Sequence, residues 1–227
     1  MNKRIFLLIV LFIPGCATNP AVIKAKKIGS TPFTTEIYLN GQNRAPAASF
    51  PAVTTGQFTD ERDKQTYKWV KVGSQVWMAQ NLNYQTETGS VAYNNDQYNA
   101  QIYGRLYTFS ALLKACPKGW HVPTDTEWML LERDLGLAYA EAGQVGSRGN
   151  IAGKFLVGGL SGFDALYAGR QHHNHFSGLA ASAYFWTSTG YGLPIAYHEI
   201  RKDKTGVYRD VTDRDDYLSL RCVKDYW

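Results

Sequence analysis

The sequence predicts an α+β domain that follows an exported leader and a tether. Two short helical segments fall within residues 103–135, and five strand-like segments follow between residues 163 and 223. Helices early and strands late favour α+β over alternating βα units. The chain has 227 residues, and because domains average roughly 150 residues, we expect one domain plus a tail.

The N-terminus has the parts of an export signal that ends in a cysteine. Lys3 and Arg4 are followed by an apolar run over residues 5–13, which is too short to cross a bilayer as a helix. The run ends in Ile13-Pro14-Gly15-Cys16, which resembles a bacterial lipobox. The resemblance implies removal of residues 1–15 and acylation of Cys16, with each buried methylene contributing about 0.8 kcal/mol to anchoring. The alternative is an ordinary signal peptide followed by a chance cysteine.

The residues after Cys16 bear on location and on domain boundaries. Ala17, in place of an aspartate, favours the outer membrane in the sorting rule of enteric bacteria. The sequence does not decide whether the protein lies on the periplasmic or the extracellular face of that membrane, and the cell surface is the preferred expectation. Residues 16–57 lack sustained periodicity and contain four prolines, so we expect the lipidated cysteine and a tether there, with the domain over residues 58–227.

The start of the domain predicts a β-hairpin and then a loop. Residues 66–72 and 75–79 are β-rich, and Gly73-Ser74 between them suits a two-residue hairpin turn with glycine first. Residues 81–101 are polar and rich in Asn and Tyr, and we expect a long loop there.

Two helices are expected next. Apolar spacing over residues 107–115 predicts the first, which ends before Pro117. The second begins at Thr124, because Glu127 three residues later completes a capping box. Its apolar face and its C-terminal glycine are expected at Trp128, Leu131, Leu135 and Gly136.

The second half of the domain predicts strands. A further short helix is expected around residues 151–156, in a glycine-rich stretch. The five strand-like segments are residues 163–170, 184–188, 196–202, 207–211 and 217–223. Residues 204–206 form the expected turn between two of these strands.

Composition excludes one class of partner and favours β-structure. Without Lys3 and Arg4, 22 of the 24 basic residues remain, and the chain has 19 acidic ones. This charge balance is too even for a nucleic-acid-binding protein. Aromatic content is 14%, spread along the chain, and Tyr and Trp suit half-buried strand surfaces.

Cys116 and Cys222 are the two cysteines that remain once Cys16 is assigned to lipid. An even pair in an oxidising compartment predicts a disulfide between the segment after the first helix and the last strand. The alternative is two buried thiols.

Five motifs carry a family resemblance. They are TYKWVKVGSQVWMAQNLNY (66–84), YGRLYTFSALLKACPKGWHVPTDTEW (103–128), GFDALYAGR (162–170), YFWTST (184–189) and YLSLRCVKD (217–225). In order and spacing they resemble the Fibrobacter succinogenes major paralogous domain, a family of lipoproteins in Fibrobacter and Bacteroidota. The resemblance implies a C-type-lectin-like fold close to the sulfatase-modifying, formylglycine-generating group. We therefore expect two short helices, small twisted antiparallel sheets, long loops, and a meeting of the first and last strands.

The sequence predicts no catalytic set and no cofactor. Formylglycine-generating relatives use a reactive cysteine pair, and lipid and disulfide would leave this chain without one. His173 and His175 would share one face if they lay on a strand, and they are the candidates for a metal site. The segment falls where a hairpin loop is expected and no third ligand has suitable spacing, so an exposed polar loop is the alternative. Acidic clusters at residues 94–96 and 213–216 offer oxygen ligands for calcium, but a solvated turn is the simpler interpretation.

We therefore expect a non-catalytic accessory or binding module, held by its N-terminal lipid and most simply a subunit of an outer-membrane protein complex. A carbohydrate-binding lectin-like module and a surface adhesion component are alternatives, and a sulfatase-modifying-type enzyme is a further one. Aromatic and amide side chains suit a protein or glycan partner. The candidate contact residues are Tyr93, Tyr98, Tyr103, His172, His173, His175, Phe176, Tyr191 and Tyr197.

Overall fold

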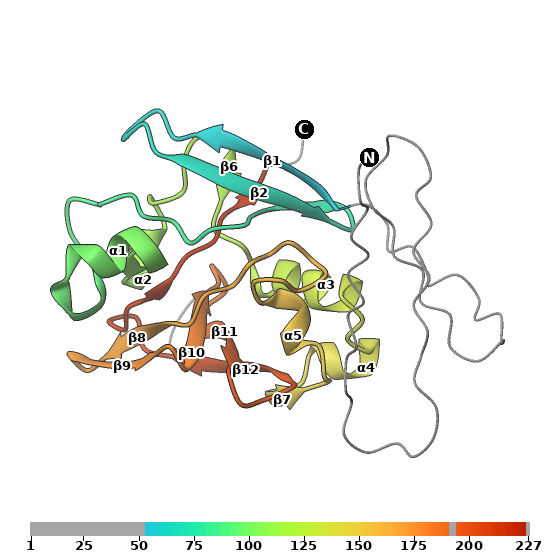
Figure 1. Ribbon diagram of the computed structural model, residues 1–227. Helices are drawn as coiled ribbons and strands as arrows, with labels where there is room; N and C mark the ends of the chain where they lie inside the picture. Colours follow the sequence, from blue (N-terminus) through green and yellow to red (C-terminus); the bar gives the residue numbers. More distant parts are fainter. Residues whose placement is uncertain (1–52, 191–193, 226–227) are drawn as a thin grey trace, which may run out of the picture. The chain divides into compact units, whose positions relative to one another are not determined.

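Two β-sheets with helices between them make up the computed structural model, which describes residues 53–190 and 194–225 (Figure 1). The mixed α+β class is confirmed. Cys16, most of the tether and Tyr191 lie outside the described residues. No helix in the described part of the chain is long and apolar enough to span a bilayer.

The first sheet joins both ends of the domain. Its order is β1 (Thr54–Thr59), β2 (Thr66–Val72), β3 (Gln75–Met78), β14 (Val223–Lys224) and β6 (Trp120–His121), with antiparallel neighbours throughout. The predicted hairpin is confirmed: Val72 pairs with Gln75, and Gly73 turns the chain at φ 57°. The first strand starts at Thr54, ahead of the expected domain start. The first and last strands share this sheet, but β2 and β3 separate them.

The second sheet is larger and mixed. Its order is β4 (Ser90–Val91), β5 (Leu106–Tyr107), β13 (Leu218–Ser219), β10 (Ser182–Trp186), β11 (Ile195–Arg201), β12 (Val207–Thr212) and β7 (Gly146–Arg148). The hairpin of β8 (Ala168–His172) and β9 (His175–Leu179) joins it through β10. The pairs of β10 with β13 and with β8 are parallel, so the expectation of purely antiparallel sheets is wrong.

Helix α3 (Asp125–Asp134) follows the sequence closely. Thr124 Oγ1 accepts from the Glu127 amide, and the Glu127 carboxylate accepts from the Thr124 amide. This capping box satisfies amides that the first turn leaves without helical partners. Trp128 and Leu131 are buried, and Gly136 follows at φ 100°. The start, the apolar face and the end of the helix are all confirmed.

The remaining helices are short, and there are more of them than predicted. They are α1 (Gln97–Tyr103), α2 (Phe109–Leu112), α4 (Tyr139–Ala142) and α5 (Ala152–Phe155), with a 3-10 turn at Tyr93–Asn95. The long loop expected over residues 81–101 is wrong, because α1 begins within it. The missed signal is Asp96, whose carboxylate caps the helix by accepting from the Tyr98 amide at 2.9 Å.

The predicted last strand, residues 217–223, is two strands in two different sheets. Between β13 and β14 the chain crosses from the second sheet to the first. At the crossing Arg221 is buried, donating from Nε to Asn81 Oδ1 at 2.8 Å and from Nη2 to the Asp164 carbonyl at 2.9 Å. Burial lowers the pKa of Arg221 to about 9.

The main core lies between the sheets and is centred on α3. Trp128 packs against Trp77 of the first sheet at 4.8 Å between ring centroids and against Phe185 of the second at 5.2 Å. Figure 1 shows α3 and α5 between β2 and β12. A second apolar cluster around Tyr107, Trp186 and Leu218 supports α2. Both clusters position the surface loops described next.

Candidate functional site

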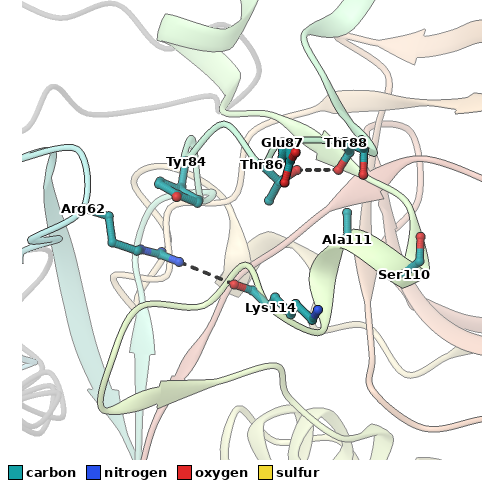
Figure 2. Close-up of a pocket in the computed structure, with 8 residues that line it drawn as sticks. All are labelled: Arg62, Tyr84, Thr86, Glu87, Thr88, Ser110, Ala111 and Lys114. Atoms are coloured by element: carbon teal, nitrogen blue, oxygen red, sulfur yellow. Dashed lines mark hydrogen bonds between the residues drawn. The ribbon is translucent and has the colours of Figure 1, made fainter.

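A surface hollow of about 460 Å³ lies beside α2 (Figure 2). We call it the Arg62–Lys114 hollow. Its lining consists of Arg62, Tyr84, Thr86, Glu87, Thr88, Ser110, Ala111 and Lys114. Its volume falls in the range of about 300–1,000 Å³ that ligand pockets occupy. Sequence reasoning missed it, because its residues come from the turn after β1, the segment before β4, and α2 with the residues that follow it.

Arg62 holds one wall of the hollow in place. It donates to both carboxylate oxygens of Asp60, with Nε at 2.9 Å from Oδ1 and Nη2 at 2.6 Å from Oδ2. Nη2 also donates to the Ala115 carbonyl at 2.7 Å, and the guanidinium lies 3.8 Å from the centroid of the Tyr84 ring. Burial alone would raise the pKa of Asp60, but the bonds from Arg62 outweigh it and lower that pKa. The charge of Arg62 is therefore already neutralised.

The opposite wall depends on a glycine. Gly89 has φ 74°, and a Cβ there would lie 2.5 Å from Thr108 Oγ1. The Thr108 amide donates to the Gly89 carbonyl at 2.9 Å, and Thr108 Oγ1 caps α2 by accepting from the Ala111 amide. Glycine is needed because no other residue allows this backbone conformation and this close approach together. Loop and helix therefore form one fixed wall.

Two charged side chains of the hollow remain unpaired. Within residues 53–190 and 194–225, neither Lys114 Nζ nor the Glu87 carboxylate has a hydrogen bond or an ion pair. Hydroxyl groups lie among them: Thr86 Oγ1 donates to the Thr88 carbonyl, and Ser110 Oγ lies 3.1 Å from Thr108 Oγ1. The hollow thus offers a donor, an acceptor and hydroxyls to a ligand.

The predicted aromatic contact surface is only partly exposed. Tyr93 and Tyr197 are buried, at 7% and 6% exposure, so placing them on a contact surface is wrong. Tyr93 packs against Phe176 at 5.1 Å, whereas Tyr197 packs against Tyr184 at 6.1 Å. These rings sit on half-buried sheet and loop surfaces, where their area contributes to packing.

The other residues of that predicted surface are scattered. Tyr98, on α1, is 66% exposed. Tyr103 is half-buried at the end of α1 and lines a smaller cavity of about 190 Å³. The structure therefore brings Tyr93 and Phe176 together, but it does not gather the predicted residues into one binding face.

The histidine run lies at the expected hairpin, where His172 ends β8, His175 begins β9, and His173 and Asn174 form the turn. His173 and Asn174 adopt left-handed φ values of 47° and 63°, and His172 pairs across the hairpin with His175. The premise that His173 and His175 share a strand face is therefore wrong. His172 Nδ1 lies 2.7 Å from the Asp216 carboxylate, so one acid of the calcium candidate already has a partner. In the described residues no group of three or more His, Cys, Asp or Glu is arranged to hold a metal ion.

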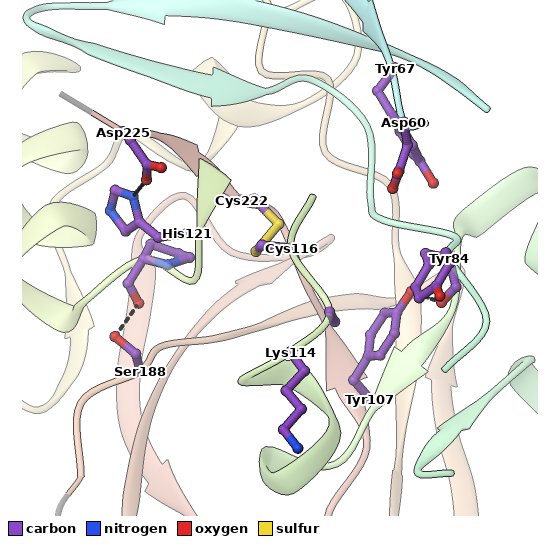
Figure 3. The surroundings of a disulfide bond; sticks show 12 residues. Asp60, Tyr67, Tyr84, Tyr107, Lys114, Cys116, His121, Ser188, Cys222 and Asp225 are labelled. Atoms are coloured by element: carbon purple, nitrogen blue, oxygen red, sulfur yellow. Dashed lines mark hydrogen bonds and ion pairs between the residues drawn. A yellow bond between two sulfur atoms is a disulfide. The ribbon is translucent and has the colours of Figure 1, made fainter. Parts of the chain in front are cut away.

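The predicted disulfide between Cys116 and Cys222 is confirmed (Figure 3). Near it, His121 bridges two carboxylates, with Nε2 at 2.7 Å from Glu127 and Nδ1 at 2.8 Å from Asp225. The bond to Glu127 is the main cause that raises the pKa of His121. His121 therefore connects the α3 cap to the chain end that follows β14.

A buried ionic network joins α3 to the second sheet. Glu132 accepts from Arg148 at 2.7 and 2.8 Å, and His198 lies between Glu132 at 2.7 Å and Asp125 at 3.0 Å. Arg209 donates to Asp125 with both Nε and Nη2. Burial would lower the pKa of His198, but the two carboxylates outweigh it and raise that pKa. Sequence reasoning missed the network, since its members come from four separate elements.

The model of the Fibrobacter succinogenes major domain matches residues 70–224. The chain belongs to this family. No curated protein and no solved structure gives a significant match to the chain. The motifs of the Fibrobacter succinogenes major domain lie mostly in the framework: the β2–β3 hairpin, α3, the disulfide and β10. The Arg62–Lys114 hollow combines Ser110 and Ala111 of α2 and Lys114 after it with the loop at residues 84–88 and with Arg62.

Proposed function

We propose that this protein is a non-catalytic lipoprotein, anchored through Cys16 to the outer membrane, and an accessory subunit of an outer-membrane protein complex. The lipobox-like ending Ile13-Pro14-Gly15-Cys16 supports the anchor. The disulfide supports the non-catalytic role, because Cys116 and Cys222 cannot act as free thiol nucleophiles while bonded to each other. Cys16 is assigned to lipid.

The main support for a role as a subunit of a complex is a set of exposed apolar side chains around α3 and α4. Tyr139 is 80% exposed, Val145 is 66% exposed and Leu130 is 38% exposed. Arg133 of α3 lies over the Tyr139 ring at 4.8 Å, so the two helices present aromatic and cationic groups together. Exposed apolar groups beside Tyr and Arg are typical of protein interfaces.

We also propose that the fold belongs to the C-type-lectin-like architecture. Support comes from the sheet that the first and last strands share, from the two helices α2 and α3, and from the irregular segments between short strands. A crystal structure with a different connectivity of the second sheet would contradict this assignment.

Purification in mild detergent through a tag at Trp227 tests the complex. We expect stoichiometric co-purification of an integral outer-membrane protein, and its loss in a Tyr139→Ser/Val145→Ser variant. Val157→Ser is the matched control, because Val157 is 64% exposed but lies on another segment. Recovery of the wild-type protein as a lone monomer would contradict the proposal.

The anchor is tested separately. The Cys16→Ser variant should be released from the membrane fraction and should no longer incorporate labelled palmitate. Continued lipid labelling of that variant would show that Cys16 is not the acylated residue.

A further inference from the structure

We propose that the Arg62–Lys114 hollow binds a neutral saccharide. This is a second function, independent of the complex proposed above, and it is placed at residues other than the aromatic surface predicted from the sequence. The proposal rests on the chemistry of the lining. Within about 460 Å³ it combines two opposite charges that have no partner among the described residues, several hydroxyls and a fixed aromatic ring.

Charge favours an uncharged ligand. Arg62 already forms a two-bond ion pair with Asp60, so its charge is not available. Among the residues that the structure describes, the free charged groups of the hollow are then one ammonium, on Lys114, and one carboxylate, on Glu87, whose charges sum to zero. An anionic ligand would meet Glu87 and a cationic one would meet Lys114, and either approach includes a repulsive contact.

Hydroxyl groups satisfy both free charges at once. A hydroxyl donates one hydrogen bond and accepts up to two. Hydroxyls of a saccharide in the hollow can accept from Lys114 Nζ and donate to the Glu87 carboxylate. Hydrogen bonds to charged groups are the stronger ones. Thr88 and Ser110 add hydroxyls of the protein to the same lining.

The hollow also provides apolar surface for the C–H groups of a sugar. Tyr84 contributes its ring and Ala111 its methyl group. Arg62 lies 3.8 Å from the Tyr84 ring centroid and so fixes the ring before a ligand arrives, with one face of the ring covered. A fixed side chain loses less conformational entropy on binding. Figure 2 shows Tyr84 and Lys114 on two sides of the same space.

Isothermal titration and saturation-transfer NMR of the full-length lipoprotein test this, in a detergent without a sugar headgroup. The probes are maltohexaose, xylohexaose and mannohexaose, with hexagalacturonate as the charged comparator. We expect at least one neutral probe to bind, and hexagalacturonate to bind about tenfold more weakly because it meets Glu87.

Three variants locate the site. Lys114→Met and Glu87→Gln should each weaken binding of the neutral probe about tenfold or more, since each removes a charge-assisted hydrogen bond. Both side chains are exposed and unpaired in the described part of the chain, so both variants should fold. Lys118→Met, at an exposed lysine outside the lining, should change affinity by less than about twofold.

Three results would overturn the proposal: no neutral probe binds the wild-type protein, hexagalacturonate binds more tightly than every neutral probe, or Lys114→Met and Glu87→Gln bind as the wild type does. The last result would place saccharide binding elsewhere on the protein.

Discussion

Arg62 Nη2 donates to the carbonyl oxygen of Ala115 at 2.7 Å, immediately before the disulfide at Cys116. The turn after β1 is thereby linked to the end of α2 and, through Cys222, to the last strand. One arginine thus connects the wall of the hollow to the only cross-link among the described residues. Loss of the disulfide should therefore loosen the end of α2 and the wall of the hollow that Arg62 holds.

Replacing both Cys116 and Cys222 by alanine should lower the free energy of unfolding by about 2–5 kcal/mol. The two cysteines are 106 residues apart, and the chain-entropy model gives about 4.7 kcal/mol for a loop of about 100 residues. Urea unfolding with and without reductant measures this. The double variant should not respond to reductant, and equal stability of the wild type in both conditions would refute the prediction.

Thr124→Ala should destabilise the domain by about 1 kcal/mol, because the Glu127 amide loses its cap. Thr126→Ala is the matched control: Thr126 is exposed on the first turn of the same helix and has no capping bond. Urea midpoints of the two variants provide the comparison. A Thr126→Ala loss as large as that of Thr124→Ala would show that the capping box is not the cause.

His121 should stabilise the fold more at low pH than at high pH. Its folded pKa is raised above the unfolded value of about 6.5, mainly by Glu127 and further by Asp225. This contribution is fully present below about pH 6.5 and is lost as the pH rises through the raised folded value. The difference in Tm between wild type and His121→Asn should therefore be larger at about pH 6 than at about pH 9.

The cause of that shift can be isolated by an NMR titration of His121. Glu127→Gln should lower the midpoint, and glutamine retains the ability to complete a capping box. Glu61→Gln, at a carboxylate that pairs with Lys64, is the control and should leave the midpoint unchanged. An unchanged midpoint in Glu127→Gln would remove Glu127 as the cause.

Arg148→Met should cost about 3–5 kcal/mol, because Glu132 loses two buried hydrogen bonds from the guanidinium. The double variant Arg148→Met/Glu132→Leu should cost less than the sum of the single changes, since the carboxylate that lost the guanidinium is itself removed. Arg133→Met, at an exposed arginine of α3, should cost less than about 1 kcal/mol. Additive losses in urea unfolding would contradict the coupling.

Local signals in the sequence were sufficient where one segment decides its own structure. Thr124, Glu127 and Gly136 specify the two ends of α3, and Gly73-Ser74 specifies the first hairpin. The disulfide also followed from the sequence, because the predicted lipidation of Cys16 leaves a single pair of cysteines and the predicted oxidising compartment favours a bond between them. The helix ends, the hairpin turn and the disulfide each depend on a few residues, and residues elsewhere in the fold do not alter how those residues bond.

Features that depend on several distant segments were missed. His198 meets Glu132 and Asp125 only after β11 packs against α3, and spacing along the chain does not record that contact. Tyr93 and Tyr197 carry the residue type of a contact surface but are used for packing. The hollow was missed for the same reason, since Arg62, Glu87 and Lys114 come from three separate segments.

The crossing from β13 to β14 has a consequence for how the protein is made. The last residues of the domain supply an inner strand to each sheet and one half of the disulfide. Neither sheet can be completed until residues 218–224 have been synthesised, because β5, β10, β3 and β6 all pair with this segment. Most of the polypeptide must therefore be kept from aggregating before its fold can be completed.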